Sequence, residues 1–432
     1  MKIAMISEHA SPLALAGGVD SGGQNIYVAN VARQLYRAGH EVDVFTRRDR
    51  SLLPLVSGMD GIRIINVPAG PPRQIGKERL LPYMDEFADF LVSFFEQERR
   101  PYHLMHANFF MSGMAALKVK RALHIPVVTT FHALGRVRRI HQGANDGFPD
   151  ERFAIEDSLV RHSDAVIAEC PQDETDLIEL YDADPERIEI VPCGFDVDEL
   201  KRVDRREARA TLGWPRDEFI VLQLGRLVQR KGIDNVIRGI STLQSVHGVS
   251  ARLYIVGGNS ELPNEIATPE IARLRGIAEH EQVSGQITFI GRRGRTHLSL
   301  FYSAADVFVT TPWYEPFGIT PVEAMACGVP VIGADVGGIR YSVRDGETGW
   351  LVPPRDPGAL AARLAQLHAN PALARQMGVD GLARAQAQFT WEGVARSLED
   401  VYRRVARVPQ QRERDGAMAA QTARPVVGGA YG

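Results

Sequence analysis

The sequence lacks the features that mark membrane, disulfide-rich and nucleic-acid-binding proteins. It has no run of about eighteen apolar residues, so we expect no membrane-spanning helix. Its three cysteines, Cys170, Cys193 and Cys327, lie in or beside strand-like segments without metal-ligand spacing. We therefore expect reduced thiols, no metal site and a cytoplasmic protein. A net charge of −3, with acids interspersed among the arginines, gives no reason to expect a nucleic-acid partner.

Repeats and low-complexity stretches are also missing until the end of the chain. From Pro409 onward the sequence is polar and glycine-rich without periodicity, which predicts a disordered tail over 409–432. The first apolar run, in MKIAMISEHA, is too short for a signal peptide and is typical of a first strand. A length of 432 residues exceeds what one hydrophobic core supports, so we expect more than one domain.

Apolar runs alternate with helix-period segments along most of the chain, and this pattern predicts βα units that build parallel sheets. Two such series predict an α/β protein with two doubly wound, Rossmann-like domains, over 1–195 and 216–390. The charged segment 196–215 predicts a linker, and 391–408 predicts a final helix. Because ligands bind at the carboxyl ends of the strands in such sheets, we expect a site in a central cleft that both domains face.

The expected strands follow from these apolar runs. In the first series they are 2–7, 41–46, 63–67, 104–107, 127–131, 165–168 and 188–192. In the second series they are 219–224, 253–256, 287–290, 307–310, 329–332 and 349–352, and helices at 358–367 and 391–405 close the domain.

The stretch 310–331 combines two acids, a glycine turn and a helix start. Thr320 and Glu323 have the spacing of a capping box, with proline at the expected first helical position, so we expect Thr320 to cap this helix. The free N–H groups of the turn, backed by the helix dipole, offer a place for a phosphate. The alternative is that Glu323 only caps the helix and that Glu315 lies on a solvated loop.

A glycine-rich loop over 17–24 follows the first strand and opens a helix at Asn25. Glycines let the backbone approach a ligand closely, and the helix start offers N–H groups to an anion. The main competitor is a dinucleotide fold, whose glycine turn should follow its strand immediately. Here about ten residues intervene, which argues against a dinucleotide site. A flexible loop without a ligand is the other alternative.

Two cations and a histidine stand at other strand ends. Arg226 and Lys231 lie five residues apart on a turn, which suits two cations that grip a diphosphate. His132 ends the strand TTFH, where a histidine would point into the cleft, although a lone histidine is more often structural. The basic residues after it, which include Arg136, suit a phosphorylated acceptor, and solvated loop arginines are the alternative.

Taken together, these residues resemble the retaining glycosyltransferases of the GT-B fold, specifically glycosyltransferase family four. The resemblance covers nearly the whole chain, and its most specific mark is the E-x7-E pattern of Glu315 and Glu323. Within that family, the segments 7–13 and 22–25 resemble two groups. These are the inositol-phosphate N-acetylglucosaminyltransferases of mycothiol synthesis and the sucrose-phosphate synthases.

The resemblance implies an enzyme that moves a hexose from a nucleotide diphosphate sugar, with UDP as the expected nucleotide, to a hydroxyl. Configuration at the anomeric carbon would be retained. The second domain would bind the donor, with Arg226 and Lys231 offsetting the charge of the leaving diphosphate. The implied catalytic residues are His132, Glu315, Arg226 and Lys231. The implied donor contacts are Gly23, Arg226, Lys231, Arg293, Glu315, Phe317, Gly318, Ile319, Thr320 and Glu323.

The first domain would bind a small, phosphorylated sugar or polyol. The implied acceptor contacts are Gln24, Asn25, Lys77, Phe109, Thr130, Arg136 and Arg152. Lys77, Thr130 and Arg152 match positions that hold inositol phosphate in the mycothiol enzymes, whereas Phe109 stands where that group has a tyrosine. The segment 132–136 and the following helix resemble the sucrose-phosphate synthases more closely.

Other classes stay open at this point. A GT-B-fold epimerase or phosphorylase, a non-catalytic sugar-nucleotide binder and a dinucleotide oxidoreductase are the alternatives. A glycosidase also uses two carboxylates, but the phosphate-gripping cations argue against it. We expect no cofactor and no divalent metal, because the cations and the helix start already offset the diphosphate charge. The expected partners are small molecules, and a homodimer is left open.

Overall fold

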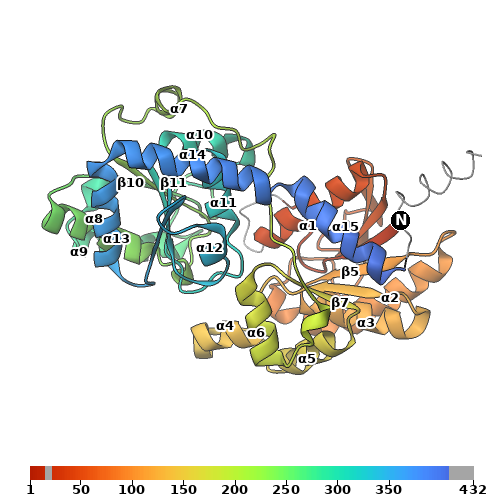
Figure 1. The fold of residues 1–432 in the computed structure, drawn as a ribbon. Helices are drawn as coiled ribbons and strands as arrows, with labels where there is room; N and C mark the ends of the chain where they lie inside the picture. Colours follow the sequence, from red (N-terminus) through yellow and green to blue (C-terminus); the bar gives the residue numbers. More distant parts are fainter. Residues whose placement is uncertain (15–21, 408–432) are drawn as a thin grey trace, which may run out of the picture.

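The computed structural model describes residues 1–14 and 22–407, which form two α/β lobes side by side (Figure 1). Each lobe has a mostly parallel sheet with helices on both faces, which confirms the predicted doubly wound architecture. Part of the predicted glycine loop and all of the predicted tail over 409–432 lie outside the described residues.

The first lobe is built on an eight-stranded sheet with the order β3-β4-β2-β1-β5-β6-β7-β8. Its strands are β1 (Lys2–Ile6), β2 (Glu41–Arg47), β3 (Val56–Met59), β4 (Ile62–Val67), β5 (Leu104–Asn108), β6 (Val127–Thr130), β7 (Ala165–Ala168) and β8 (Ile188–Ile190). Its helices are α1 (Gly23–Arg37), α2 (Met84–Gln97), α3 (Phe110–Leu123), α4 (Gly135–Gln142), α5 (Glu151–His162) and α6 (Pro171–Tyr181). Only the edge pair of β3 with β4 is antiparallel among these described strands.

The second lobe is built on a six-stranded parallel sheet with the order β11-β10-β9-β12-β13-β14. Its strands are β9 (Ile220–Leu224), β10 (Arg252–Val256), β11 (Ile287–Gly291), β12 (Val307–Thr310), β13 (Val331–Ala334) and β14 (Gly349–Val352). Its helices are α8 (Ile233–His247), α9 (Pro269–His280), α10 (Leu298–Ala304), α11 (Ile319–Ala326), α12 (Gly337–Ser342), α13 (Pro357–Ala369) and α14 (Pro371–Gln388). Short α7 (Arg205–Leu212) falls within the segment expected to be a linker.

The last helix, α15 (Trp391–Val405), returns from the second lobe and packs on α1 of the first lobe (Figure 1). The chain crosses between the lobes twice, and the two crossings lie together. Phe195 N–H donates to the carbonyl of Phe389 at 2.8 Å, and Trp391 N–H donates to the carbonyl of Phe195 at 3.2 Å. Thr390 caps α15 because its hydroxyl accepts from the Gly393 N–H.

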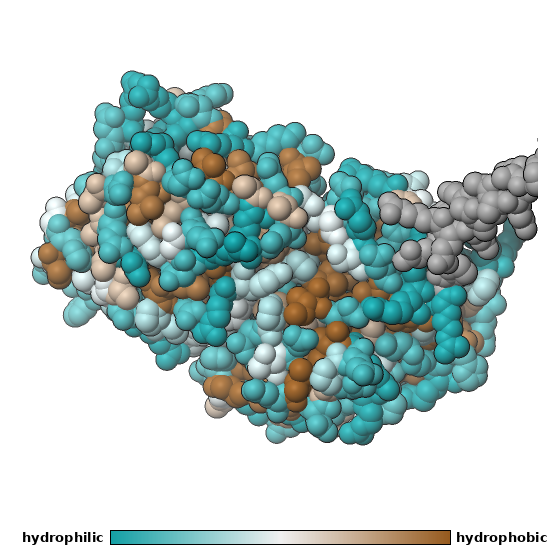
Figure 2. Space-filling view, viewed as in Figure 1, coloured by the Kyte–Doolittle hydropathy of each residue, from teal (hydrophilic) through white to brown (hydrophobic). Residues whose placement is uncertain are grey.

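One hydrophobic core is continuous between the lobes. It joins Val31 of α1, Leu222 of β9, Tyr402 of α15 and Phe317, which lies just before α11. All four side chains are buried. The far faces of the two sheets have their own clusters, under α2 and α3 in the first lobe and under α8 and α13 in the second. The face seen in Figure 2 is largely hydrophilic, with hydrophobic residues gathered near the junction of the lobes. The shared core holds the facing strand ends in a fixed arrangement.

Candidate active site

A cavity of about 440 Å³ lies between the lobes and is lined by residues of both. Most of the residues predicted for the site line this cavity. From the first lobe they are Gly23, Gln24, Asn25, Lys77, Phe109, His132 and Arg152, and from the second lobe they are Arg226, Lys231, Arg293, Glu315, Phe317, Gly318, Ile319, Thr320 and Glu323. The structure thus brings together residues that lie up to three hundred positions apart in the chain.

Two predicted acceptor residues lie elsewhere. Thr130 is buried at the end of β6, where its hydroxyl lies 2.8 Å from His106 Nε2. Arg136 pairs with Asp157, with Nη2 and Oδ2 2.9 Å apart, and its guanidinium lies over the ring of Tyr181. Neither side chain is among those that line the cavity.

The start of α11 differs from the prediction. Gly318 is the N-cap, with φ of +85°, and the helix begins at Ile319, so the expected capping box of Thr320 and Glu323 is wrong. The glycine adopts a left-handed conformation that most residues avoid, and this starts the helix two residues earlier than a Thr320 cap would. Glu323 is then free to bond other side chains. No side chain caps this end, so its N–H groups stay available toward the cavity.

Two helix starts face each other across the cavity. α1 begins at Gly23, and a Cβ placed there would lie 3.5 Å from the Ile319 side chain at the start of α11. A Cβ on Gly22 would lie 3.6 Å from the guanidinium carbon of Arg226. The positive ends of two helices and one guanidinium therefore converge, which suits an anion such as a diphosphate.

Lys231 and Glu315 form an ion pair on the second-lobe wall. Burial lowers the pKa of the Lys231 ammonium to about 8, although Glu315 raises it. Burial raises the pKa of Glu315, but the nearby Lys231 and Arg230 outweigh burial, and the net pKa lies below its usual value. Next to Lys231, a Cβ on Gly232 would lie 1.9 Å from the Thr311 carbonyl oxygen, so this turn needs glycine. The pair is a fixed, charged feature of the cavity rather than part of a solvated loop.

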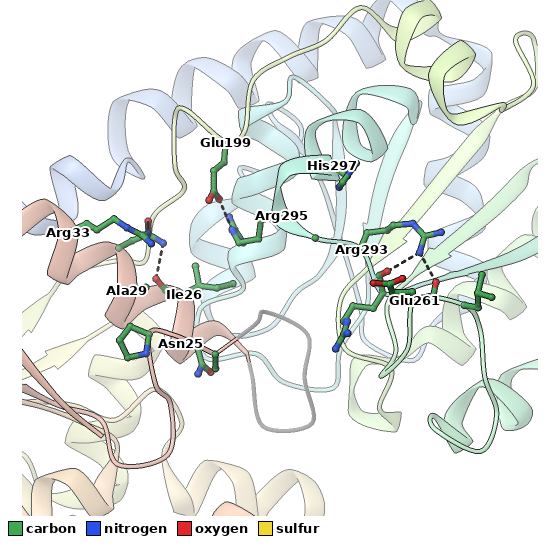
Figure 3. Close-up of a pocket in the computed structure, with 15 residues that line it drawn as sticks. Asn25, Ile26, Ala29, Arg33, Glu199, Glu261, Arg293, Arg295 and His297 are labelled. Carbon is green, nitrogen blue, oxygen red and sulfur yellow. Dashed lines mark hydrogen bonds and ion pairs between the residues drawn. The ribbon is translucent and has the colours of Figure 1, made fainter. Parts of the chain in front are cut away.

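Glu323 is buried on the first turn of α11 and is held by two donors. Arg295 Nη1 lies 3.0 Å from Oε1, and the Tyr302 hydroxyl donates to Oε2 at 2.9 Å. Arg295 also pairs with Glu199, with Nε and Oε2 2.6 Å apart (Figure 3). Burial, followed by Glu323, raises the pKa of Tyr302 well above its usual value, so its hydroxyl keeps its proton. Both carboxylate oxygens are therefore oriented before any ligand arrives.

The Arg293 side chain lies away from this network. Its Nη1 donates to the carbonyl of Glu261 at 2.7 Å and to the carbonyl of Arg292 at 2.8 Å (Figure 3). It lines both the central cavity and a neighbouring cavity of about 830 Å³ between α1 and the segment 292–297. The bonds to two carbonyls fix the guanidinium between the two cavities.

The first-lobe wall holds a buried arginine. Arg152 pairs with Glu156, with Nε and Oε1 2.7 Å apart, and its Nη2 donates to the Ala133 carbonyl. Its guanidinium carbon lies 5.0 Å from the ring centre of Phe109 and 4.7 Å from that of Phe148. Arg152 Nη1 is buried and has no hydrogen-bond partner within the described part of the chain. A buried donor without a partner is costly, so an anionic ligand would satisfy it.

The lining also contains residues that the sequence-based site prediction left out. They are His9, Glu169 and Cys193, and the lining also includes Arg138 from the basic run that was expected to suit a phosphorylated acceptor. His9 stands in the opening segment that carries the family resemblance, and Arg138 stands in the basic run after His132. Glu169 directly follows β7, so its position at the carboxyl end of a strand was the available signal.

Residues 1–14 and 22–407 contain neither a cluster of metal-ligating side chains nor a helix suited to a bilayer. In these ranges, no three histidine, cysteine or acidic side chains gather as metal ligands would. No helix in the same ranges combines the length and apolar character needed to cross a bilayer.

Two Rossmann-like domains with an anion-binding cleft between them define the GT-B class. The family model for glycosyl transferases group 1 matches residues 204–382, and the model for Glycosyltransferase Family 4 matches residues 21–199. The chain is 35% identical over 409 residues to the D-inositol 3-phosphate glycosyltransferase of Corynebacterium diphtheriae, which covers 93% of this chain and 94% of that one. It therefore belongs to the group 1 and family 4 glycosyltransferases and is an enzyme of that class.

Solved structures of glycosyltransferases share this two-domain fold. The sucrose-phosphate synthase from Thermosynechococcus elongatus superimposes with a TM-score of 0.86 at 33% identity, over 94% of this chain and 100% of that one. HepE from Anabaena, solved in complex with UDP-glucose, superimposes with a TM-score of 0.71 at 19% identity, over 93% and 99% of the two chains. At that identity the second likeness concerns the fold alone.

Proposed function

We propose that this enzyme transfers a hexose from a UDP-hexose to a hydroxyl of a phosphorylated polyol or sugar, with retention at the anomeric carbon. The observation that carries the proposal is one cavity in which Lys231 and the start of α11 face the buried Arg152 of the other lobe. Cations on both walls suit a donor and an acceptor that each bear phosphate. The relatives named for inositol phosphate and for sucrose phosphate support this acceptor class.

The second lobe would hold the donor. In this arrangement Arg226, Lys231 and the N–H groups of Gly318 to Thr320 bind the diphosphate, and Glu323 accepts hydrogen bonds from the ribose. Glu315 contacts the hexose hydroxyls, Phe317 packs behind the turn, and Arg293 lies near the nucleobase. The choice of UDP follows the family resemblance, and a neighbour of the same fold was solved in complex with UDP-glucose.

The first lobe would hold the acceptor, with its phosphate on Arg152 and Lys77 and with Gln24 and Asn25 close to the reacting hydroxyl. That oxygen attacks the anomeric carbon from the face on which the diphosphate departs. The bond between this carbon and the diphosphate oxygen breaks, and the departing oxygen takes the acceptor proton. Fixed cations stabilise the charge that develops on the leaving group. We propose that the reaction takes place in the cytoplasm without a divalent metal.

Release of nucleotide on addition of an acceptor tests the proposal. UDP-, GDP- and ADP-hexoses are each incubated with inositol phosphate or fructose 6-phosphate, with and without EDTA. We expect release from a UDP-sugar only when a phosphorylated acceptor is present, with an unchanged rate in EDTA. An epimerase would convert the donor without releasing the nucleotide, and a non-catalytic binder would bind UDP without turnover.

The pH dependence of kcat/KM for the donor should follow the protonation of the Lys231 ammonium. Burial lowers its pKa to about 8, so the side chain is charged below that pH and loses its charge as pH rises through it. We expect kcat/KM for the donor to fall above about pH 8, because this parameter follows the free enzyme. Lys231→Arg is the control, since a guanidinium does not titrate in this range. If kcat/KM for the donor falls at the same alkaline pH in Lys231→Arg, the decrease belongs to the titration of another group.

The Tyr302 hydroxyl should tune nucleotide affinity through Glu323. Tyr302→Phe removes the bond to Oε2 and leaves the ring in the core. We expect UDP to bind about 5- to 10-fold more weakly by calorimetry, because the carboxylate loses one of its orienting donors. Tyr36→Phe, on the exposed surface of α1, is the matched control. Unchanged UDP affinity in Tyr302→Phe would show that Glu323 does not depend on this bond.

A further inference from the structure

The ring of His132 is held on both sides by oxygen atoms. Nδ1 lies 2.7 Å from Glu169 Oε1, and Nε2 lies 3.0 Å from Asn108 Oδ1. Tyr27 adds an edge-on ring contact at 4.8 Å between centroids. The His132 and Glu169 side chains are 9% and 4% exposed, so water competes little for these bonds. The hydrogen-bond partners therefore determine which ring nitrogens carry protons.

The Asn108 amide can point only one way. Its Nδ2 donates to the carbonyls of Ile6 at 3.4 Å and His106 at 3.2 Å. Turning the amide over would place Oδ1 against two carbonyl oxygens, so that acceptor would face acceptor. Oδ1 therefore faces His132, where it can accept a proton but cannot donate one.

Glu169 is the other acceptor. It directly follows β7, its Oε1 accepts from the Cys193 thiol at 3.2 Å, and its N–H donates to Asp173 Oδ2 at 3.2 Å. Burial, followed by Glu169, raises the pKa of the Cys193 thiol well above its usual value, so the thiol remains a donor. The same causes raise the pKa of Asp173, which favours its neutral form. The Cys193 thiol and the His132 Nδ1 therefore both face Glu169 Oε1.

Two further groups beside the His132 ring, His106 and Tyr27, are neutral. Burial lowers the pKa of His106 to about 3, so that ring is neutral between the Tyr402 hydroxyl and Thr130. Burial raises the pKa of Tyr27 well above its usual value, so its hydroxyl keeps its proton.

We propose that Glu169 and Asn108 hold His132 as an imidazolium, and that Glu169 is a positioning residue for the transfer reaction. A ring that donates from both nitrogens has no lone pair, so His132 does not act as the base for the acceptor hydroxyl. That deprotonation is left to the departing diphosphate. This role rests on the proposed function, whereas the charge state of the ring does not.

The hydrogen bonds to the His132 ring also restrain the backbone at His132 and Ala133, which connects the ring to Arg152. His132 has φ of +57°, in the left-handed region that non-glycine residues seldom occupy. The next carbonyl, of Ala133, accepts from Arg152 on the acceptor wall. Glu169 therefore orients, through His132, the turn between the reacting hexose and the acceptor anion.

The charge state can be measured in the free protein. Long-range proton–nitrogen correlation spectra of histidine-labelled enzyme at pH 7.5 should show protons on both nitrogens of His132, assigned as the pair absent from His132→Gln. In Glu169→Gln the ring should show one protonated and one bare nitrogen. A bare ring nitrogen in the wild type, or an imidazolium that persists in Glu169→Gln, would overturn the proposal. Failure of the wild type to transfer hexose would instead reject the proposed function and leave these spectra unaffected.

Kinetics test the positioning role separately. Glu169→Gln should lower kcat by about 10- to 100-fold, because a charge-assisted bond that orients the turn is lost. The KM for the donor should change by no more than about twofold, since no donor contact is removed. Glu179→Gln, an exposed carboxylate on α6, is the matched control and should be unchanged. An unaltered kcat in a folded Glu169→Gln enzyme, verified by thermal unfolding, would reject the positioning role.

Discussion

Lys231→Ala should lose about 100- to 1000-fold in kcat while the protein stays folded, because it removes the fixed positive charge that we propose stabilises the leaving diphosphate. The ammonium lies in the wall of the cavity beside Glu315, in a turn held by Gly232. Initial rates of UDP release with a saturating acceptor measure the effect. Because the charge develops only as the bond breaks, kcat should fall more than the affinity for the UDP-hexose donor.

The controls separate charge from structure. Lys231→Arg keeps the cation and should retain much more turnover than Lys231→Ala. Arg238→Ala removes an exposed cation from the neighbouring helix α8 and should leave the rate unchanged. Loss of Lys231 also leaves Glu315 with the more distant Arg230 as its cation, at 3.9 Å, so circular dichroism and thermal unfolding accompany the kinetics. Near-normal turnover in Lys231→Ala would remove this residue from the mechanism.

The fold could be predicted from the sequence because its signals are local. Continuous buried apolar runs separated by helix-period segments specify parallel strands, and they place most strands within a residue or two. Where non-local packing decides, the sequence is less informative. The strand expected at 329–332 is β13 at Val331–Ala334, because Val329 and Pro330 belong to the turn after α11. The edge strand β3 and the long helix α14 were not predicted, since the former has little apolar alternation and the latter only a weak apolar face.

The candidate site could be predicted in part for the same reason. Residues in glycine turns and at helix starts, such as Gly318 and Lys231, carry a signal in their immediate neighbours. Which side chains meet across the cavity depends on the sheet order, which no local pattern contains. Glu169 was therefore not predicted as a site residue, although it contacts His132. Conversely, Arg136 was predicted for the site, but its guanidinium lies over the ring of Tyr181. The capping box failed because a left-handed glycine can begin a helix as well as a threonine can.

Arg152→Met should abolish the preference for a phosphorylated acceptor. The guanidinium is buried, carries one donor without a partner among the described residues and lies among the rings of Phe109, Phe110 and Phe148. Methionine has a similar length and packs against aromatic rings without charge. We expect kcat/KM for a phosphorylated acceptor to fall by about 10- to 100-fold, as for a lost hydrogen bond to a charged group. Slow hydrolysis of the donor without acceptor should persist, because the second lobe is unchanged.

Arg152→Met also lowers the free energy of unfolding, because it leaves the buried Glu156 without its ion-pair partner. Breaking a buried ion pair on one side costs about 3–5 kcal/mol, even though Glu156 keeps bonds from the Gly135 N–H and the Tyr181 hydroxyl. The double variant Arg152→Met with Glu156→Gln removes the stranded charge and should recover most of the free energy of unfolding. Acceptor use should stay lost in it, since no cation has returned to the wall. If the double variant is stable and still prefers a phosphorylated acceptor, Arg152 serves only the packing of the first lobe, and the acceptor phosphate must bind to other cations of the cavity lining, such as Lys77 and Arg138.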